Sequence, residues 1–173
     1  MDIPELFVER SRYYLGQEYR TKLRRAVEAL PPDAIWRRTS PEANSAGNLL
    51  LHLTGNVRQW IVSGVGGIPG ERNRAAEFAA REGAGAGDLL AGLETVLDEA
   101  DAVLARLTAT DLLDKRNFQG RHVSVLEAVY HVVEHFAMHT GQIILLAKQY
   151  APGSVKFYED AGGLARPVWQ AKP

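Results

Sequence analysis

Apolar side chains recur along four long segments of the chain at spacings of three, four and seven residues. This spacing places them on one face of an α-helix. It predicts helices over residues 4–30, 45–63, 88–107 and 124–149. No segment of comparable length alternates apolar and polar residues as a β-strand does. Four amphipathic helices of this length predict an all-α fold, a four-helix bundle.

Polar residues at the helix ends support these boundaries. Ser124 followed by Glu127 has the spacing of a capping box at the start of the fourth helix. Asn44 or Ser45 is expected to cap the second helix, and Asp88 the third, because their side chains accept bonds from free backbone N–H groups. The sequence therefore predicts where these helices start, to within a few residues.

The segments between the helices differ in character. Residues 66–87 form a long connection between the second and third helices, rich in glycine and alanine, with one short turn of helix expected around 75–80. A tight turn or small hairpin is expected about Gly120. The tail, 151–173, is expected to be irregular, with three aromatic residues packed on the bundle: Phe157, Tyr158 and Trp169. The whole chain, 1–173, is interpreted as a single domain of ordinary size.

Composition narrows the classes of function. Twenty basic and 21 acidic side chains give a formal charge of −1, so no broad field favours nucleic acid or anionic lipid. The chain has no cysteine, which removes disulfides, thiolate metal sites and a cysteine nucleophile. No stretch approaches the roughly 20 apolar residues that span a bilayer, and the first residues do not resemble a secretory signal. The expectation is a cytoplasmic protein without a membrane or nucleic-acid partner.

Histidine interrupts the apolar seam of the fourth helix. Steps of four and three residues, which keep side chains pointing at a bundle axis, connect Ala128, Val132, His135, His139, Gln142 and Leu146. The middle of this seam is polar, although side chains at the centre of a bundle are expected to be the most buried ones. Two histidines four residues apart lie about 40° apart around a helix and can close on one ion. A pair of this kind needs a further ligand from another helix.

The second helix offers that ligand. Its core-type positions, again three or four apart, are Leu49, His52, Asn56 and Trp60. A lone histidine on an apolar face is more often a hydrogen-bonded core residue than a ligand. Three clustered imidazoles are different, because burying them unpaired costs about 1–3 kcal/mol each and one divalent ion satisfies all three. The sequence therefore predicts a metal site formed by His52, His135 and His139.

Other polar residues near this site have two interpretations. Gln142 and Asn56 line the same seams, either as buried amides that orient the histidines or as catalytic groups. Glu134 is expected to face solvent or a dimer contact, about 100° around the helix from His135. Three arginines could bind an anionic substrate or simply be solvated: Arg58, Arg72 and Arg74. No residue is assigned a catalytic role.

Two segments also resemble a known family. The string HVVEHFAMHTGQI, residues 131–143, resembles the signature of the DinB/YfiT-like metalloenzyme superfamily, with two histidines four apart before a Gly-Gln pair. NSAGNLLLHLTGNVRQWI, residues 44–61, resembles that superfamily's other metal-bearing segment. GGIPGERNRAAEF, residues 66–78, is similar to the loop of one uncharacterised branch. The resemblance runs in order from about residue 45 to residue 149.

The resemblance implies a four-helix bundle, often a homodimer, with a three-histidine site for zinc or nickel. By motif position the ligands would be His52, His135 and His139, and His131 would lie beside them without binding the metal. Other branches are thiol-S-transferases or isomerases that use low-molecular-weight thiols, bacillithiol or mycothiol. The function expected here is that of a metal-dependent enzyme of the thiol-S-transferase or hydrolase type.

Two alternatives differ from that expectation. One is a non-catalytic dimeric bundle in which the metal fixes the helices and the protein binds a partner. The other is a di-iron bundle, which is disfavoured because it needs paired Glu-x-x-His segments on two helices. Three protein ligands leave an ion open to water or substrate, which favours catalysis over a closed structural site.

Overall fold

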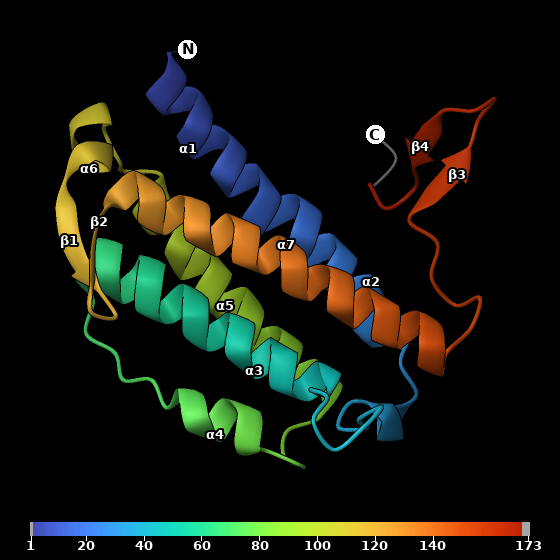
Figure 1. The fold of residues 1–173 in the computed structure, drawn as a ribbon. Coiled ribbons are helices and arrows are strands. Elements are labelled where there is room, and N and C mark those ends of the chain that lie inside the picture. The colour runs from blue at the N-terminus through green and yellow to red at the C-terminus, as the bar shows by residue number, and fades with distance from the viewer. Residues whose placement is uncertain (1, 171–173) are drawn as a thin grey trace.

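A computed structural model describes residues 2–170, and these form an antiparallel helical bundle with two small hairpins (Figure 1). The first helix runs without a break from residue 3 to residue 28 through a π-helical middle. The helical segments are α1 (Ile3–Tyr13), η1 (Tyr14–Tyr19), α2 (Arg20–Glu28), η2 (Pro32–Ala34), α3 (Ala46–Val57), η3 (Arg58–Val65), α4 (Arg74–Ala79), α5 (Ala86–Leu104), α6 (Ala109–Leu113) and α7 (Val125–Tyr150). The strands are β1 (Lys115–Phe118), β2 (Arg121–Ser124), β3 (Tyr158–Asp160) and β4 (Ala165–Pro167).

Four long rods make the bundle: α1–η1–α2, α3–η3, α5 and α7. Contacts join α3 to both α5 and α7, and α2 to both α5 and α7, so the four rods enclose one core. That core holds fully buried apolar side chains from every rod, among them Leu23, Leu50, Leu53, Ile61, Leu93, Leu104, Phe136 and Ile143. The prediction of an all-α four-helix bundle is confirmed.

The helix ends follow the expected capping chemistry with one exception. Ser45 caps α3, and Ser124 with Glu127 forms the predicted capping box of α7. The expected cap at Asp88 is wrong: α5 begins earlier, after Gly85, and Asp88 lies in its first turn. There its carboxylate still faces the positive end of the helix dipole, so the residue type fits the first turn as well as the cap.

The turn about Gly120 is the predicted hairpin. Strands β1 and β2 pair in antiparallel register, with Phe118 opposite Arg121. The two residues between them, Gln119 and Gly120, have φ values of 50° and 79°. Two successive positive φ angles are typical of the tight type I′ turn, whose twist matches that of the strands it joins.

The tail is more ordered than the sequence predicts. Strands β3 and β4 form a second antiparallel hairpin, whose turn contains Gly162 and Gly163 at positive φ. Phe157 and Trp169 are buried on the bundle, as expected, whereas Tyr158 is about half exposed. The Tyr158 hydroxyl accepts a bond from Lys22 Nζ at 3.0 Å, so this residue joins the tail to α2 at the rim of the core.

The long connection between α3 and α5 is fixed to the bundle by α4. The amide of Asn48, which is fully buried, donates to the carbonyl oxygens of Glu77 at 2.8 Å and Ala80 at 2.9 Å. Arg38 donates to the carbonyl of Phe78 at 2.9 Å. These bonds satisfy the carbonyl groups that the end of a helix leaves free, so this short helix lies in one place against α3.

No helix in residues 2–170 combines the length and the apolar character needed to cross a bilayer.

Candidate metal centre

Three histidines meet between α3 and α7. His52 comes from the middle of α3, and His135 and His139 come from successive turns of α7. Their ring centroids are 4.9 Å (His52 to His135), 5.1 Å (His52 to His139) and 4.4 Å (His135 to His139) apart. One ligand nitrogen from each ring lies within 4.8 Å of the other two. The structure therefore brings together the three residues that the sequence singled out.

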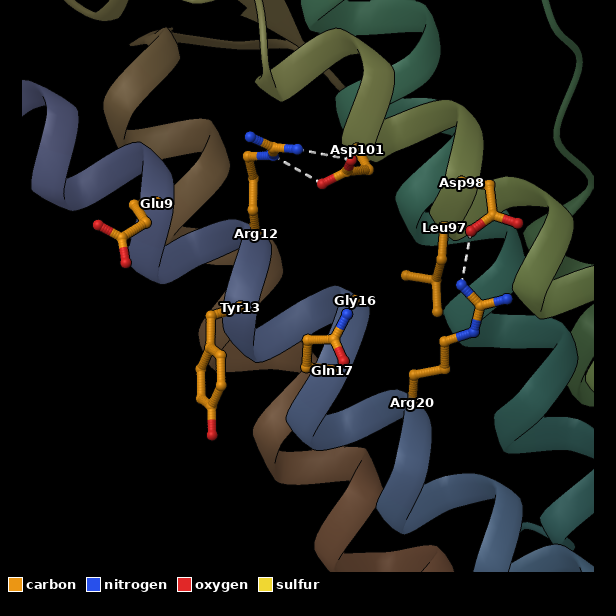
Figure 2. A pocket seen from close by; sticks show the side chains of 9 residues that line it. All are labelled: Glu9, Arg12, Tyr13, Gly16, Gln17, Arg20, Leu97, Asp98 and Asp101. Atoms are coloured by element: carbon orange, nitrogen blue, oxygen red, sulfur yellow. Dashed lines mark hydrogen bonds and ion pairs between the residues drawn. The ribbon is translucent and has the colours of Figure 1, made fainter. Parts of the chain in front are cut away.

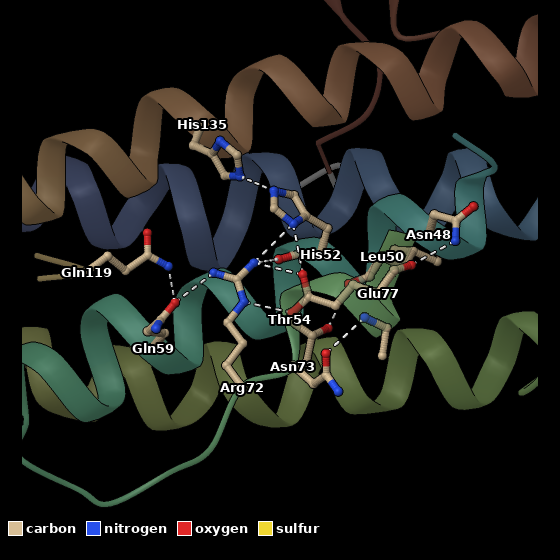
Figure 3. A network of polar contacts seen from close by, with 11 residues as sticks. Asn48, Leu50, His52, Thr54, Gln59, Arg72, Asn73, Glu77, Gln119 and His135 are labelled. Carbon is tan, nitrogen blue, oxygen red and sulfur yellow. Dashed lines mark hydrogen bonds and ion pairs between the residues drawn. The ribbon is translucent and has the colours of Figure 1, made fainter. Parts of the chain in front are cut away.

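A buried ion pair lies behind the ring of His52, on its Nδ1 side, and fixes that ring in place (Figure 3). Its Nδ1 lies 2.9 Å from Oε2 of Glu77, a residue of α4. Arg72 donates through Nε and Nη2 to both oxygens of that carboxylate, at 2.7 and 2.8 Å. Nη2 of Arg72 also lies 3.0 Å from this Nδ1, but it has the Glu77 carboxylate to donate to. The carboxylate can only accept, so the neutral imidazole donates its Nδ1–H to Glu77 and keeps the lone pair on Nε2. That lone pair faces the other two histidines.

Burial and charge act in opposite directions on this carboxylate. Burial alone would raise the pKa of Glu77, but hydrogen bonds from Arg72 and His52 outweigh it, and the pKa is lowered. The side chains of Arg72 and Glu77 are only 6% and 10% exposed. Arg72 also donates to Gln59 at 2.9 Å, which fixes the guanidinium in turn. The carboxylate is thus ionised at neutral pH and is a strong acceptor for His52.

A glycine makes room for the pair. A Cβ atom placed on Gly55 would come within 2.1 Å of Oε1 of Glu77 and 2.8 Å of Nε of Arg72. No heavy atom tolerates such a distance, so only glycine lets the carboxylate lie against α3 at this position. Gly55 follows His52 by three residues and therefore lies on the same side of the helix.

A neutral amide orients the ring of His139. Nδ1 of His139 lies 2.7 Å from Oε1 of Gln142, one turn further along α7. Its Nδ1–H donates to that oxygen, which leaves the Nε2 lone pair for the centre of the cluster. Gln142 is exposed rather than buried, so it is an orienting amide at the edge of the bundle. Of the two interpretations of this residue, the bond supports the orienting one.

The ring of His135 faces that of His52 directly. Nε2 of His135 lies 2.9 Å from Nε2 of His52. Burial, followed by the charges of His139 and His52, lowers the pKa of His135 to about 3. Burial also lowers the pKa of His139. Both imidazoles are therefore neutral at pH 7, which is the form that binds a metal.

This donor set fits a borderline divalent ion. Bonds of about 2.0–2.1 Å to imidazole nitrogen place two ligand atoms on one ion roughly 3 Å apart, close to the separation of the nitrogens of His52 and His135. Three imidazoles accept zinc, nickel, copper or iron, and the absence of cysteine rules out thiolate ligands. Hydrogen bonds from Nδ1 to a carboxylate or amide are the usual second partners of metal-binding histidines.

His131 and Asn56 lie beside the cluster. The ring of His131 stacks 5.5 Å from that of His135 and 4.5 Å from that of Trp60, and it lies outside the group of three. Asn56 is 3% exposed, and its Oδ1 has no hydrogen-bond partner among the described residues. The seam of the second helix is thus buried as predicted. The side-chain oxygen of Asn56 accepts no hydrogen bond from a described residue.

The three arginines considered as anion ligands have separate surroundings. Arg58 forms two bonds with Glu99, at 2.9 and 2.8 Å, and Arg72 belongs to the buried pair behind His52. The guanidinium of Arg74 lies 4.8 Å above the ring of Phe78, whose ring is 4.6 Å from that of His52. Glu134 is exposed, as expected. Two of the three arginines are therefore bound to carboxylates of this chain.

A groove elsewhere on the bundle shares no residue with the cluster. It has a volume of about 440 Å³ and lies between α1–η1 and α5 (Figure 2). Arg12 bonds Asp101 across it at 2.7 and 2.8 Å, and Arg20 bonds Asp98 at 2.5 Å. These two pairs join the first helix to α5, and Glu9 adds a third carboxylate to the lining.

Sequence reasoning missed Glu77, and it gave Arg72 a different role. No helical spacing relates position 77 to position 52, because a connection of irregular backbone separates them. The available signal was composition: Arg72 and Glu77 are charged residues in a connection otherwise rich in glycine and alanine. Charge in such a segment is usually solvated, so the signal is weak without the fold.

Comparisons with known proteins agree with this architecture. A family model described as mycothiol-S-transferase matches residues 14–151. The fold is similar to that of a DinB-like protein from Bacillus cereus ATCC 10987, with a TM-score of 0.66, 21% identity, and coverage of 86% of this chain and 95% of that one. A DinB-like protein from Bacillus subtilis gives 0.64 and 19%, with 89% and 97% covered. A search of curated proteins found no match.

At these identities the solved structures support the fold alone, whereas the family model covers both histidine-bearing helices and the connection between them. The predicted superfamily is confirmed, and the family model identifies a named family within it. The chain belongs to the mycothiol-S-transferase family, within the DinB/YfiT-like superfamily.

Proposed function

We propose that this protein is a metal-dependent thiol-S-transferase, with one divalent ion held by Nε2 of His52, His135 and His139. The observation that carries the proposal is the pairing of ring nitrogens: Nδ1 of His52 and Nδ1 of His139 are both occupied by acceptors of this chain, at 2.9 and 2.7 Å. Their Nε2 lone pairs are thereby directed at one point. Membership of the family supplies the reaction class.

A divalent ion at this point would act as a Lewis acid and lower the pKa of a thiol bound to it. The residues of the chain prepare the site. Glu77 and Gln142 fix the tautomers of two imidazoles, and burial keeps His135 neutral. The ring of Phe78 lies 4.6 Å from that of His52 and covers one side of the cluster.

The reaction needs no oxidant or reductant. The thiol sulfur forms a bond to an electrophilic carbon of the second substrate while the bond from that carbon to its leaving group breaks. The leaving group departs with the electron pair of that bond, and the thiol proton passes to water. A hydrolase would use water in place of the thiol, and the family assignment favours the thiol.

Metal analysis of purified variants tests the ligand set. The natural chain should bind one zinc or nickel ion per chain, and His135→Ala and His139→Ala should lose it. His122→Ala is the matched control, because His122 is exposed in the β1–β2 hairpin, outside the cluster, and should leave the metal in place. Stoichiometric metal in both α7 variants would overturn the ligand assignment.

Activity tests the reaction class. The metal-loaded protein should transfer mycothiol to an activated aryl halide, and the metal-free protein should not. The metal-free protein should remain folded by circular dichroism, because the apolar core is complete without the ion. Collapse of the fold on metal removal, together with inactivity against a panel of thiols and electrophiles, would instead support a structural metal in a non-catalytic bundle.

A further inference from the structure

The three candidate ligands are not oriented in the same way. His52 and His139 each have an acceptor at Nδ1, from Glu77 and Gln142 respectively. His135 differs: its Nε2 faces His52, and no hydrogen bond joins its Nδ1 to another described residue. An imidazole without such a bond turns easily about its bond to Cβ, unless neighbouring groups pack against it. The ring of His135 therefore needs another means of orientation.

A row of aromatic rings packs against His135 and ends at the β1–β2 hairpin. The ring of His131, one turn earlier on α7, is stacked on that of His135, with centroids 5.5 Å apart. Trp60 of η3 lies 4.5 Å from His131. Phe118, the last residue of β1, is stacked on Trp60 at 5.3 Å, with 4° between the ring planes. These four rings, called the aromatic row below, are spaced like the aromatic pairs of protein cores, at about 4.5–7 Å.

The hairpin end of the aromatic row is tightly packed. Trp60 and Phe118 are each 3% exposed. A Cβ atom placed on Gly64 would lie 2.5 Å from Cε1 of Phe118, so only glycine lets this ring lie against η3. Arg116, also in β1, donates to the carbonyl of Val65 at the end of η3, at 2.7 Å. The hairpin is therefore fixed against η3, and the ring of Phe118 with it.

The next residue of the hairpin is linked to a different ligand. Nε2 of Gln119 donates to Oε1 of Gln59 (Figure 3). The same oxygen, which has two lone pairs, also accepts a bond of 2.9 Å from Nη1 of Arg72. Arg72 in turn donates to Glu77, the partner of His52. Four hydrogen-bonded side chains therefore lead from the hairpin turn to Nδ1 of His52.

The backbone of Gln119 is strained. Its φ of 50° lies in the left-handed region, and within residues 2–170 no other residue except glycine has a positive φ. The first central position of a type I′ turn normally takes asparagine, aspartate or glycine. Glutamine is one methylene longer than asparagine, and its amide reaches Gln59 from this position. A strained residue whose side chain contacts a candidate site suggests a role in that site, because such strain is retained mainly where it serves function.

We propose that the tip of the β1–β2 hairpin positions two of the three candidate ligands. Gln119 acts on His52 through the four hydrogen-bonded side chains. Phe118 acts on His135 through the aromatic row. His131 is a spacer in that row, a role that needs its ring and neither of its nitrogens. The proposal rests on the ligand set of the proposed function, and it adds positioning residues that lie outside the two helices carrying the ligands.

A matched pair of variants tests the aromatic row. His131→Phe keeps an aromatic ring at this position, and His131→Ala removes it. Zinc affinity, measured by competition with a chromogenic chelator, should stay within about threefold of natural protein in His131→Phe and fall about tenfold in His131→Ala. Equal losses in both variants would show that a nitrogen of His131 is needed. Unchanged affinity in both would show that the ring is not needed, and either result would overturn this half of the proposal.

The hydrogen-bonded side chains are tested by a change that should move stability and metal binding in different directions. Gln119→Gly removes the amide and introduces the residue that adopts this φ without strain. The urea midpoint should therefore stay or rise, whereas zinc affinity should fall about tenfold. His122→Ala, exposed in β2, is the control and should change neither. Natural zinc affinity in Gln119→Gly, or a fall in both quantities, would overturn this half of the proposal.

Imidazole resonances of the metal-free protein separate this proposal from the proposed function. In isotope-labelled protein, Gln119→Gly should shift the ring nitrogens of His52, and His131→Ala those of His135. The ring of His139, which is held at Nδ1 by a residue of its own helix, should change least. These shifts, without thiol transfer by the natural protein, would count against the proposed function alone. Thiol transfer by the natural protein, with both sets of resonances unmoved in the variants, would remove the role of the hairpin and leave the function intact.

Discussion

The two sides of the histidine cluster are constructed differently. On the α4 side, His52 is held by an ion pair whose members are 6% and 10% exposed, and Gly55 lets that pair lie against α3. On the α7 side, His139 is held by the neutral amide of an exposed residue, Gln142, at the edge of a cavity. His52 is thus held by a closed, charged pair, and His139 by an exposed, neutral amide.

This difference assigns the two sides separate tasks. A buried ion pair is costly to disturb, because either member alone is an uncompensated charge, so it fixes one ligand in place. An exposed amide costs little to move and can exchange partners with water or substrate. The closed α4 side therefore fixes His52, and we propose that a substrate enters from the open α7 side.

The largest expected effect is on the closed side. Arg72→Ala leaves the Glu77 carboxylate buried without its cation, and the free energy of unfolding should fall by about 3–5 kcal/mol. Urea denaturation measures it. Arg58→Ala is the matched control, because Arg58 and Glu99 are about one third exposed and such a pair contributes only about 0–1 kcal/mol. Equal losses in both variants would show that the pair behind His52 is not special.

A smaller effect is expected from the glycine that makes room for the pair. In Gly55→Ala the new methyl group must displace Glu77, which should cost about 1–3 kcal/mol in unfolding free energy and weaken zinc binding. Gly92→Ala provides the comparison. Gly92 is an exposed helical residue of α5 with free space around it, and alanine there should stabilise by about 0.5–1 kcal/mol. A Gly55 variant as stable as natural protein would contradict the observed packing.

Acid should destabilise the metal-free protein through the histidines of α7. The folded pKa of His135 is about 3 and that of His139 is also lowered, whereas an unfolded histidine titrates near about 6.5. The unfolded chain therefore binds more protons in this window, and stability falls as the pH drops below about 6.5. Urea midpoints measured at several pH values should decline less steeply in His135→Gln, and as steeply as in natural protein in His122→Gln.

The smallest change in stability is expected on the open side. Gln142→Ala removes an exposed amide, so the free energy of unfolding should change by less than about 1 kcal/mol. Zinc affinity should nevertheless fall about 10-fold, because the ring of His139 is no longer oriented. Competition with a chromogenic chelator measures this, with Glu134→Ala, an exposed residue of the same helix, as the control. Unchanged affinity would remove Gln142 from the centre.

Helical periodicity was sufficient to predict the bundle and the convergence of the three histidines. His52, His135 and His139 lie on segments whose spacing orients them toward one axis, and spacing is visible in a sequence. The seam of α7 was less regular than its steps suggested: Val132 and Leu146 are buried, whereas Gln142 is exposed. An α-helix turns by slightly less per residue than a heptad pattern assumes, so positions at the edge of the seam leave the core.

The residues behind the histidines could not be predicted in the same way. Glu77 reaches His52 across 25 positions, through a connection with no period. Its place depends on bonds from Asn48 to the carbonyls of residues 77 and 80, which require the folded backbone. Periodicity reports which face of an element is buried, and it carries no information about a loop that returns to that element.

The return of α4 to α3 makes the connection between α3 and α5 part of the candidate centre. Connections of this length usually tolerate deletion and exchange between proteins. Here a shorter version without Arg72 and Glu77 would keep all three histidines and lose the group that orients His52. A protein engineer who transfers this centre to another helical bundle would need to transfer residues 72–77 and a glycine opposite them, together with the three ligands.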